Sequence, residues 1–581
     1  MPPILPRSVA SLTTQDGARR GPPLSLLPEI ITALTRRTTN PLRVWWRRSW
    51  FYRRRLRGPL ADHIVFHPYD ALPRRLEDAD ALLRGRFRFA GENIEVKEES
   101  VFDLAPASIG WAQALHDFSW LPPLSAAGGE PARKLATNLI GQWVRRNGKY
   151  SEPAWLPHII ARRLIHIFAH GRMVIVNSDV LWRSKLFVSL REQSRMLARI
   201  AAEAPDGLPR LEAAAALALS GACLDDDPAR LEQGLKRLEE EIARQILPDG
   251  GHVSRSPEVL LQCYRHIIMV TDALNAISQE IPHPVRSAHD RIAPMLRFFR
   301  HGDGGLALFN GSTESNAKMI AGLLARDEVR GQPFGYARHS GYQRLAAGKS
   351  LVVLDCGSAP PGPFSLQAHA GCLAFEMSSS GERLIVNCGA TGPQHPQWES
   401  ALRATAAHSA LTLADRSMAA VLPAGLARDL LGPRLIGGPT DIATRRVDTP
   451  QGWMIEASHD GYQSIFGIRH ERQITLSPQG LMLTGADRLI PTGKAHQNLG
   501  FVIRFHIHPD VRVSTSQGGG ILLKLPNGEG WRFRSGAPVT IEESVYLGSG
   551  QVRRAEQLVI SGEVKDMQIE LAWVFEQILS N

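Results

Sequence analysis

The spacing of apolar residues changes near Gly335, and this change constrains the fold more than any other feature of the chain. Before Gly335, apolar residues recur at i, i+3, i+4 and i+7, as in amphipathic helices, within residues 132–148, 155–175, 189–204, 210–224 and 228–247. After it, short segments alternate apolar and polar residues or are rich in β-branched ones, with Gly, Asn or Ser between them. We therefore expect a helical bundle, solenoid or toroid followed by a large antiparallel β-sandwich.

The length of 581 residues also requires more than one domain, because single cores stop growing at about 250–300 residues. We predict a basic N-terminal extension over residues 1–58, a helical domain over 59–335 and a sandwich over 336–581. Residues 1–30 are rich in Pro, Ser and Thr, and we expect them to be poorly ordered.

The net charge of +10 is concentrated in one segment, which has nine arginines and no acidic residue between Arg36 and Arg57. The arginines are interleaved with the aromatic residues Trp45, Trp46, Trp50, Phe51 and Tyr52. Such a segment suits phosphate, sulfate or carboxylate groups, or an anionic membrane surface. The alternative is a docking helix that packs its aromatic rings inward and leaves its arginines in water. We expect no nucleic-acid partner.

Several functional classes lack their sequence signatures. No run approaches the roughly 18 apolar residues of a membrane span, and no apolar run follows the first arginine as a secretory signal requires. The five cysteines are odd in number and widely spread, which is typical of a reducing compartment and of small core residues. Nucleotide-binding loops, HExxH and GxSxG are absent from the sequence.

Several stretches resemble proteins of the heparinase II/III family. They include WAQALHDFSWL (111–121), WLPHIIARRLIHI (155–167), LPDGGHVSRSPE (247–258) and HSGYQRL (339–345). The most specific are HAGCLAFEMSSSGERLIVNCGA (369–390) and WESALRATAAHSALTL (398–413), which keep the frame of the family's histidine motifs, including Arg403, Thr405 and His408. The resemblance extends over nearly the whole chain from about residue 60, and it implies an α/α toroid-like helical domain followed by the sandwich.

The resemblance also implies a carbon–oxygen lyase acting on an acidic, uronate-containing polysaccharide by β-elimination. In such a reaction the uronate carboxylate is neutralised, a base removes the C5 proton, and an acid protonates the leaving oxygen. A non-catalytic glycan-binding protein on the same scaffold is the alternative. By resemblance the protein belongs in the cell envelope or periplasm; without a visible signal peptide, the cytoplasm is the alternative.

The family's structural zinc site has counterparts at His369, Asn387 and His408, where Asn387 replaces an aspartate. An amide oxygen is a weaker zinc ligand than a carboxylate, and two imidazoles leave the ion half coordinated. Water, a nearby acid, or Cys372 or Cys388 could complete the shell, although on a regular strand Cys372 would face away from His369. The alternative is a hydrogen-bonded cluster without metal.

Three positions that carry the family's chemistry have changed. Gln367 stands in place of a histidine, Val259 in place of a tyrosine, and Leu208 in place of an asparagine. Conceivable replacements are the histidines His158 and His166 on one helix, and we predict catalytic roles for His252, Arg255, Tyr264, Tyr342 and Arg403. Of these, the arginines would pair with a uronate carboxylate, and His252, after two glycines, would face the cleft.

Overall fold

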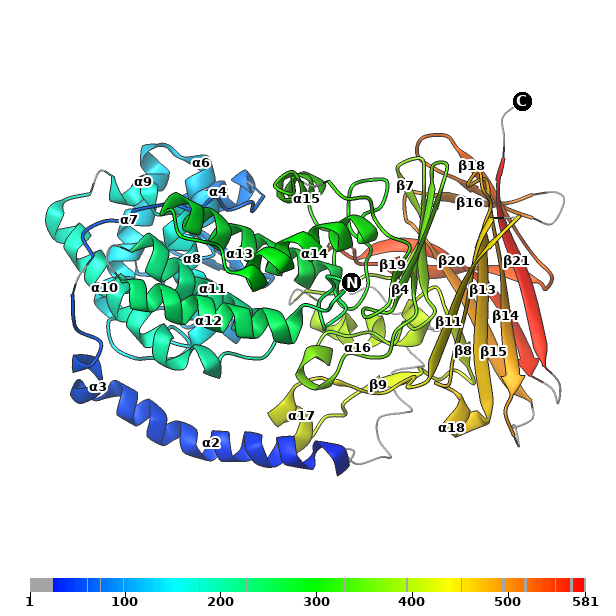
Figure 1. Ribbon diagram of the computed structural model, residues 1–581, viewed down its shortest axis with the longest axis horizontal. Helices are drawn as coiled ribbons and strands as arrows, with labels where there is room; N and C mark the ends of the chain where they lie inside the picture. The colour runs from blue at the N-terminus through cyan, green and yellow to red at the C-terminus, as the bar shows by residue number, and fades with distance from the viewer. Residues whose placement is uncertain are drawn as a thin grey trace.

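A computed structural model describes residues 24–578 except 60, 74, 98, 177, 225–226, 329, 393–394, 451, 494–497, 517–519, 549 and 565–567. The first 23 residues, which include most of the segment expected to be poorly ordered, lie outside the described residues. Helices form one half of the molecule and sheets the other (Figure 1). The predicted order of a helical domain and then an antiparallel sandwich is therefore confirmed.

The helices match the amphipathic segments of the sequence. Those that precede the sandwich are α2 (Leu27–Arg48), α3 (Trp50–Arg54), α4 (Leu76–Leu83), α5 (Ile109–His116), α6 (Leu121–Ala127), α7 (Gly129–Arg146), α8 (Pro157–His170), α9 (Arg172–Ile175), α10 (Val180–Ile200), α11 (Leu208–Cys223), α12 (Pro228–Gln245), α13 (Pro257–Ala276), α14 (His283–Phe299) and α15 (Ala317–Leu324). Within the sandwich half lie α16 (Glu399–Leu402), α17 (Leu426–Leu431) and α18 (Gln463–Phe466).

Helix α11 lies at the centre of the helical domain, with nearly all of its side chains buried. It packs closely against α12 because both helices have a glycine at the contact. A Cβ atom on Gly221 would lie 2.2 Å from the backbone nitrogen of Leu231, and one on Gly234 would lie 2.3 Å from that of Ala218. These two glycines are thus required by the close approach of the backbones.

Two large antiparallel sheets make up the sandwich among the described residues. One has the order β19 (Val539–Tyr546), β20 (Arg553–Val564), β15 (Leu499–Ile507), β7 (Glu382–Val386), β6 (Phe375–Ser379), β5 (Ser350–Asp355), β4 (Tyr342–Ala347), β3 (Tyr336–Ala337), with β8 (Leu411–Leu413) beside β15. The other has the order β11 (Ile442–Thr449), β12 (Gly452–His459), β13 (Ile468–Leu476), β14 (Met482–Pro491), β21 (Ile569–Ile578), β18 (Gly530–Ser535), β17 (Ile521–Lys524), β16 (Arg512–Thr515). Two-stranded ribbons are formed by β1 (Arg86–Phe89) with β2 (Glu92–Glu95) and by β9 (Ala419–Val421) with β10 (Leu435–Gly437).

Aromatic side chains from both large sheets meet in the core between them. Phe375 of β6 stacks on Trp573 of β21 with ring centres 5.7 Å apart, and Phe505 of β15 contacts Trp573 edge-on at 4.9 Å. All three are buried. Alternation along the strands places these rings inward, which explains the period of two in the sequence.

Polar contacts join the helical domain to the sandwich. The carboxylate of Asp249 accepts hydrogen bonds from the backbone of His339 at 2.8 Å and from the backbone and hydroxyl of Ser340, each at 2.7 Å. The guanidinium of Arg255 donates to the carbonyls of Ser340 and Ser358 at 2.8 and 2.9 Å. The loop before α13 is therefore fixed to the start of the sandwich.

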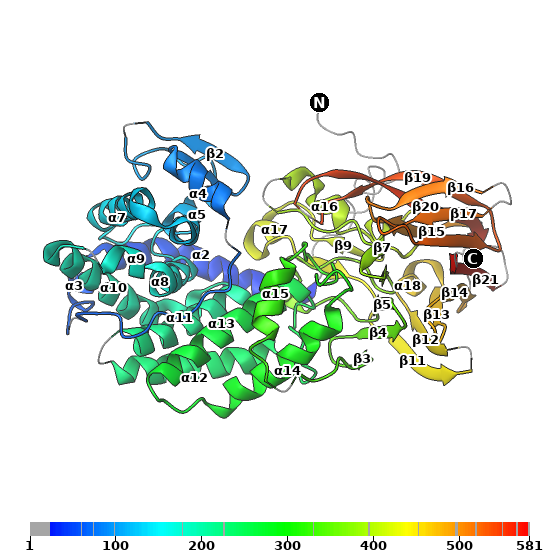
Figure 2. The same ribbon diagram turned by 90° about the horizontal axis from the view of Figure 1, so that it is seen from above.

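Helix α2 runs outside the body of the molecule, from α3 beside the helical domain to α17 in the sandwich half (Figures 1 and 2). Glu29 forms an ion pair with Arg434, and Arg47 forms one with Glu203 at 2.5 Å. None of the residues described in α2 is buried. The helix begins at Leu27, so the expectation of poor order up to residue 30 is wrong for its last few residues.

Candidate functional site

A pocket of about 290 Å³ lies beside His369, one of the histidines predicted from the sequence as metal ligands. Its walls come from loops of the sandwich and from Gly311 of the segment that links the two domains. The polar groups that line it include Gln367, His369, Glu399 and Arg403. This pocket, called the sandwich pocket below, therefore contains two of the residues predicted from the sequence, His369 and Arg403.

The two predicted histidine ligands, His369 and His408, lie together. Nδ1 of His369 is 3.1 Å from Nε2 of His408, whose Nδ1 lies 2.9 Å from the carbonyl oxygen of Ala404. Because a carbonyl only accepts, Nδ1 of His408 carries the proton and its Nε2 accepts from His369. Burial lowers the pKa of His408 to about 4 and that of His369 well below its usual value, so both rings are neutral near pH 7.

The third predicted ligand, Asn387, already forms a hydrogen bond with each polar atom of its side chain. Its amide nitrogen donates to Glu376 at 3.2 Å, and its oxygen accepts from the backbone of Ser409 at 3.0 Å. Cys388 turns its sulfur toward His506 at 3.5 Å, and no group of three or more His, Cys, Asp or Glu side chains among the described residues could hold a metal. The residues present therefore do not fit a zinc ion held by three protein ligands.

The predicted catalytic arginines hold backbone carbonyls. Arg403 donates to the carbonyls of Ala368, Pro433 and Ser365 at 2.8, 2.6 and 3.0 Å. Arg255 is buried between the domains and forms an ion pair with Asp355. Neither guanidinium is presented to a pocket with its donors free.

The predicted catalytic phenols and the imidazole of His252 are also buried. The hydroxyl of Tyr342 donates to the carbonyl of Arg255 at 2.8 Å, and that of Tyr264 lies 3.2 Å from Nε2 of His289 in the helical domain. Both ring nitrogens of His252 have partners, Ser254 at 2.7 Å and Gln245 at 2.9 Å. The expectation that His252 faces a cleft is wrong, because its ring lies in the interior next to Phe364.

Known proteins that resemble this chain identify its family. The family model for the heparinase II/III-like C-terminal domain matches residues 329–574. FtsZ-localized protein C of Caulobacter vibrioides is 32% identical over 543 residues, which cover 90% of this chain and 93% of that protein. The chain belongs to the heparinase II/III family.

Solved structures share the whole fold of this heparinase II/III protein at low sequence identity. Heparinase III has a TM-score of 0.70 at 15% identity and covers 99% of this chain and 94% of its own. A mutant of heparan sulfate lyase HepC from Pedobacter heparinus has a TM-score of 0.61 at 16% identity, covering 91% and 88%. The protein thus has the toroid and sandwich scaffold of these two enzymes.

None of the three positions that the resemblance marks as altered in this heparinase II/III protein carries a side chain that exchanges a proton near neutrality. Val259 and Leu208 pack against the apolar core of the helical domain. Gln367 lines the sandwich pocket, but an amide neither gives up nor takes a proton near neutrality.

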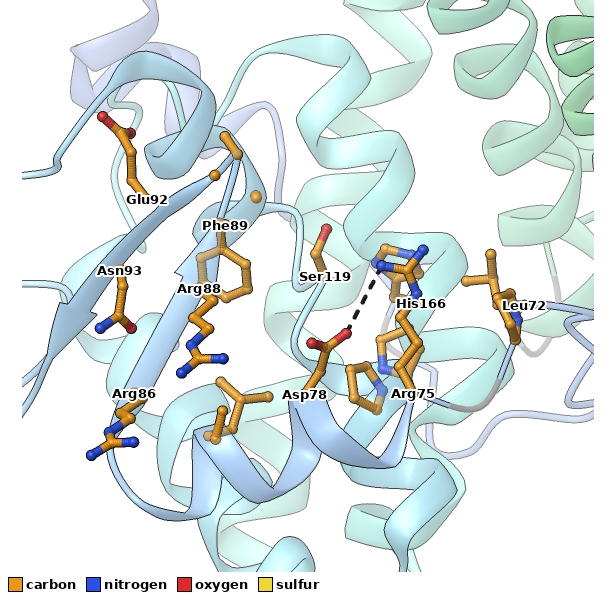
Figure 3. A pocket seen from close by; sticks show the side chains of 18 residues that line it. Leu72, Arg75, Asp78, Arg86, Arg88, Phe89, Glu92, Asn93, Ser119 and His166 are labelled. Atoms are coloured by element: carbon orange, nitrogen blue, oxygen red, sulfur yellow. Dashed lines mark ion pairs between the residues drawn. The ribbon is translucent and has the colours of Figure 1, made fainter. Parts of the chain in front are cut away.

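The sequence prediction missed a second, larger pocket in the helical domain of this heparinase II/III protein, with a volume of about 690 Å³ (Figure 3). Arginines of β1 and the buried His166 of α8 line it. The histidine was noted from the sequence. The signal that could have pointed to the pocket is RGRFRF at residues 84–89, where arginines alternate with apolar residues.

Proposed function

We propose that this protein binds an acidic saccharide on a lyase scaffold without cleaving it. The observation that carries the proposal is the state of Arg403, the guanidinium of the sandwich pocket, whose donors already hold three carbonyls. Glu399, at 3.6 Å from Arg403, adds a negative charge to the same pocket. A uronate carboxylate placed there is not neutralised, so its C5 proton keeps its low acidity.

The proton-transfer groups support the same proposal. His369 lines the pocket, and with Nδ1 donating to His408 it keeps an unprotonated Nε2 that could accept a proton. Elimination also requires an acid for the leaving oxygen, and Val259 and Gln367 stand where the family has groups for that chemistry. A base alone does not complete the elimination, because the carboxylate also needs a cation to neutralise it and the leaving oxygen needs an acid to protonate it.

A panel of uronate polysaccharides tests this directly. Incubation with heparan sulfate, hyaluronan, alginate and polygalacturonate is expected to give no rise in the ultraviolet absorbance of an unsaturated uronate, while calorimetry detects binding of at least one polymer. A rise in that absorbance with any polymer would contradict the absence of cleavage. A lack of binding to every polymer would contradict the proposed glycan binding.

We further propose that the imidazole pair of His369 and His408 is a metal-free cluster. The tautomer set by Ala404 and the two hydrogen bonds of Asn387 satisfy the polar atoms that zinc would otherwise draw on. Metal analysis of the purified protein is expected to give well under one zinc per chain, and a stoichiometric content that survives dialysis would contradict this.

A second proposed role is docking onto an anionic membrane surface through residues 36–57, supported by the orientation of α2. At about 100° per residue, Leu27, Ile31, Leu34, Leu42 and Trp45 share one helix face. Ile31, Leu42 and Trp45 are 61%, 69% and 71% exposed. The apolar face of α2 thus points away from the protein.

The polar face of α2 points toward the body of the protein. Glu29 and Arg47, which lie on the side opposite Trp45, form the ion pairs with Arg434 and Glu203. The alternative of a docking helix with buried aromatic rings is wrong, because Trp45, Trp50 and Phe51 are exposed.

An exposed apolar face flanked by arginines is the pattern of interfacial helices. No described helix has the length and apolar content needed to cross a bilayer. Sedimentation with vesicles that contain phosphatidylglycerol tests the proposal, and equal binding to neutral vesicles would contradict the part assigned to the arginines.

We propose the cytoplasmic side of the membrane for this docking. All five cysteines are buried free thiols, as expected in a reducing compartment. The identity of 32% over most of the chain to a protein named for its localisation with FtsZ supports an association with FtsZ here too. Imaging a fluorescent fusion beside labelled FtsZ tests both points, since a periplasmic signal would contradict them.

A further inference from the structure

A pocket lies in the helical domain, between α4, the β1–β2 ribbon, the start of α6 and α8 (Figure 3). Its volume of about 690 Å³ is within the range of about 300–1,000 Å³ that is usual for ligand sites. None of the residues that line it belongs to the sandwich pocket. It is therefore a separate place in which a ligand can bind.

The arginine side chains of this helical-domain pocket are not tied to backbone carbonyls, whereas Arg403 of the sandwich pocket is. The guanidinium of Arg88 in β1 forms no hydrogen bond or ion pair with any described residue, although the backbone of Arg88 pairs with β2. Arg75 lies 4.0 Å from Asp78, and both of these side chains are largely in water. An exposed pair at this distance is worth about 0–1 kcal/mol, so Arg75 can exchange this partner for a ligand carboxylate at little cost.

His166 supplies a buried acceptor at the pocket wall. Its side chain is only 8% exposed, and its Nδ1 lies 2.8 Å from the carbonyl oxygen of Asp117. Because that carbonyl only accepts, Nδ1 carries the proton and Nε2 keeps a free lone pair. Burial lowers the pKa of His166 to about 4. The nearby charges of His170 and Arg265 also lower this pKa, while the carboxylate of Asp70 raises it. The ring is neutral near pH 7 and can accept a hydrogen bond from a ligand hydroxyl.

Ser119 and Phe89 add groups that suit a sugar ring, and the carboxylates of Asp78 and Glu92 also line the pocket. The hydroxyl of Ser119 donates to Asp117 at 2.6 Å, which leaves its oxygen as an acceptor toward the pocket. Phe89 is held against Trp111 at 5.7 Å and presents an apolar surface to the same space. Cations, neutral acceptors and an aromatic surface together are what a charged saccharide needs and a lipid chain does not.

We propose that this pocket binds a carboxylated sugar of an acidic saccharide. Arg75 and Arg88 bind the carboxylate, Nε2 of His166 accepts from a ring hydroxyl, and Phe89 packs against the apolar face of the sugar. The proposal rests on the proposed glycan-binding function and assigns its site to the helical domain instead of the sandwich pocket.

Calorimetry with tetragalacturonate as the probe and maltotetraose as its neutral counterpart tests the assignment. The full-length protein is expected to bind the first and not the second. The Arg75→Gln/Arg88→Gln variant is expected to lose at least about tenfold in affinity, because two charge-assisted contacts disappear. His166→Ala is expected to lose several-fold.

Arg84 provides the matched control, since it is an exposed arginine of the same lobe that does not line the pocket. Arg84→Gln is expected to bind like the native protein, and equal melting temperatures show that each variant is folded. Native affinity in the Arg75→Gln/Arg88→Gln variant, or a loss only in Glu399→Gln and Gln367→Ala, would overturn the pocket assignment while leaving glycan binding in place. No binding of tetragalacturonate by the native protein would overturn the pocket assignment, and failure of the whole polysaccharide panel as well would remove the proposed function too.

Discussion

The guanidinium carbon of Arg255 lies 4.7 Å from the centre of the Tyr342 ring, across the junction of the two domains. Arg255 has a φ of +59°, a left-handed conformation that costs a residue with a side chain roughly 1 kcal/mol or more. The surrounding contacts keep it there, since Tyr342 donates its hydroxyl proton to the Arg255 carbonyl and the guanidinium pairs with Asp355. This residue therefore holds the two halves of the scaffold in register.

Replacing Arg255 by alanine is expected to destabilise the protein by about 3–5 kcal/mol, because the buried carboxylate of Asp355 loses its counter-ion. Arg255→Lys is expected to recover only part of this, since an ammonium cannot reach several carbonyls in one plane. Denaturant unfolding followed by tryptophan fluorescence measures the change. Arg338→Ala, at an exposed arginine nearby, serves as the control. A loss near zero for Arg255→Ala would contradict the role of Arg255 in holding the two domains together.

The fold was readable from the sequence because periodicity is a local signal. The change near Gly335 is followed directly by the first sandwich strand at Tyr336. Side-chain partners are not local. Arg255 finds its carbonyls at Ser340 and Ser358, and Arg403 finds one at Pro433, so these arginines look like carboxylate ligands until the chain is folded.

The helical-domain pocket escaped prediction for the same reason. Arg75 directly precedes the short helix α4 and Arg88 lies on the short strand β1, and the charged residues around both resemble a solvated surface. Only packing against α8, which brings His166 under them, turns that surface into a site. In contrast, the apolar residues Val259 and Leu208 are recognised from the sequence alone, because matching a motif to the family's motif requires no knowledge of the folded contacts.

Asn387→Asp tests whether the histidine cluster can still become a metal site. The new carboxylate would stand against Glu376, whose oxygen lies 3.2 Å from the Asn387 amide nitrogen in the native protein. In chelator we expect a loss of about 1–3 kcal/mol, because a buried hydrogen bond is replaced by repulsion. Zinc is expected to restore part of the melting temperature of the variant and to leave the native protein unchanged. Stabilisation of the native protein by zinc would contradict the metal-free assignment.

The stability of the protein is expected to fall as the pH drops from 7 toward 5, and His252 contributes to this. Burial lowers the pKa of His252 to about 3, so between pH 3 and the ordinary value of 6.5 the unfolded state binds the extra proton. Each such group removes up to about 1.4 kcal/mol of stability per pH unit in that window. His252→Gln is expected to give a shallower decline in denaturant unfolding. His283→Gln, at an exposed histidine, is expected to keep the native slope, and an unchanged slope in His252→Gln would show that this ring titrates normally.

If α2 docks onto a membrane, three of its outward-facing side chains are expected to contribute strongly to vesicle binding. Burying each of Ile31, Leu42 and Trp45 in the interface contributes about 1.5–3 kcal/mol at most, so changing all three to serine is expected to weaken binding to phosphatidylglycerol vesicles at least about a hundredfold. Because none of the three is buried, folding stability is expected to stay the same.

The matched control changes two apolar residues of similar exposure outside α2. Val180 and Leu181 of α10 are 70% and 74% exposed, and their replacement by serine is expected to leave vesicle binding unchanged. Changing Arg37 and Arg48, which are exposed beside the apolar face, to glutamine is expected to weaken vesicle binding at low salt and to change it little at high salt, because screening already suppresses their attraction there. Equal losses in the α2 and α10 variants would mean that exposed apolar residues in general, and not this helix, hold the protein on the membrane.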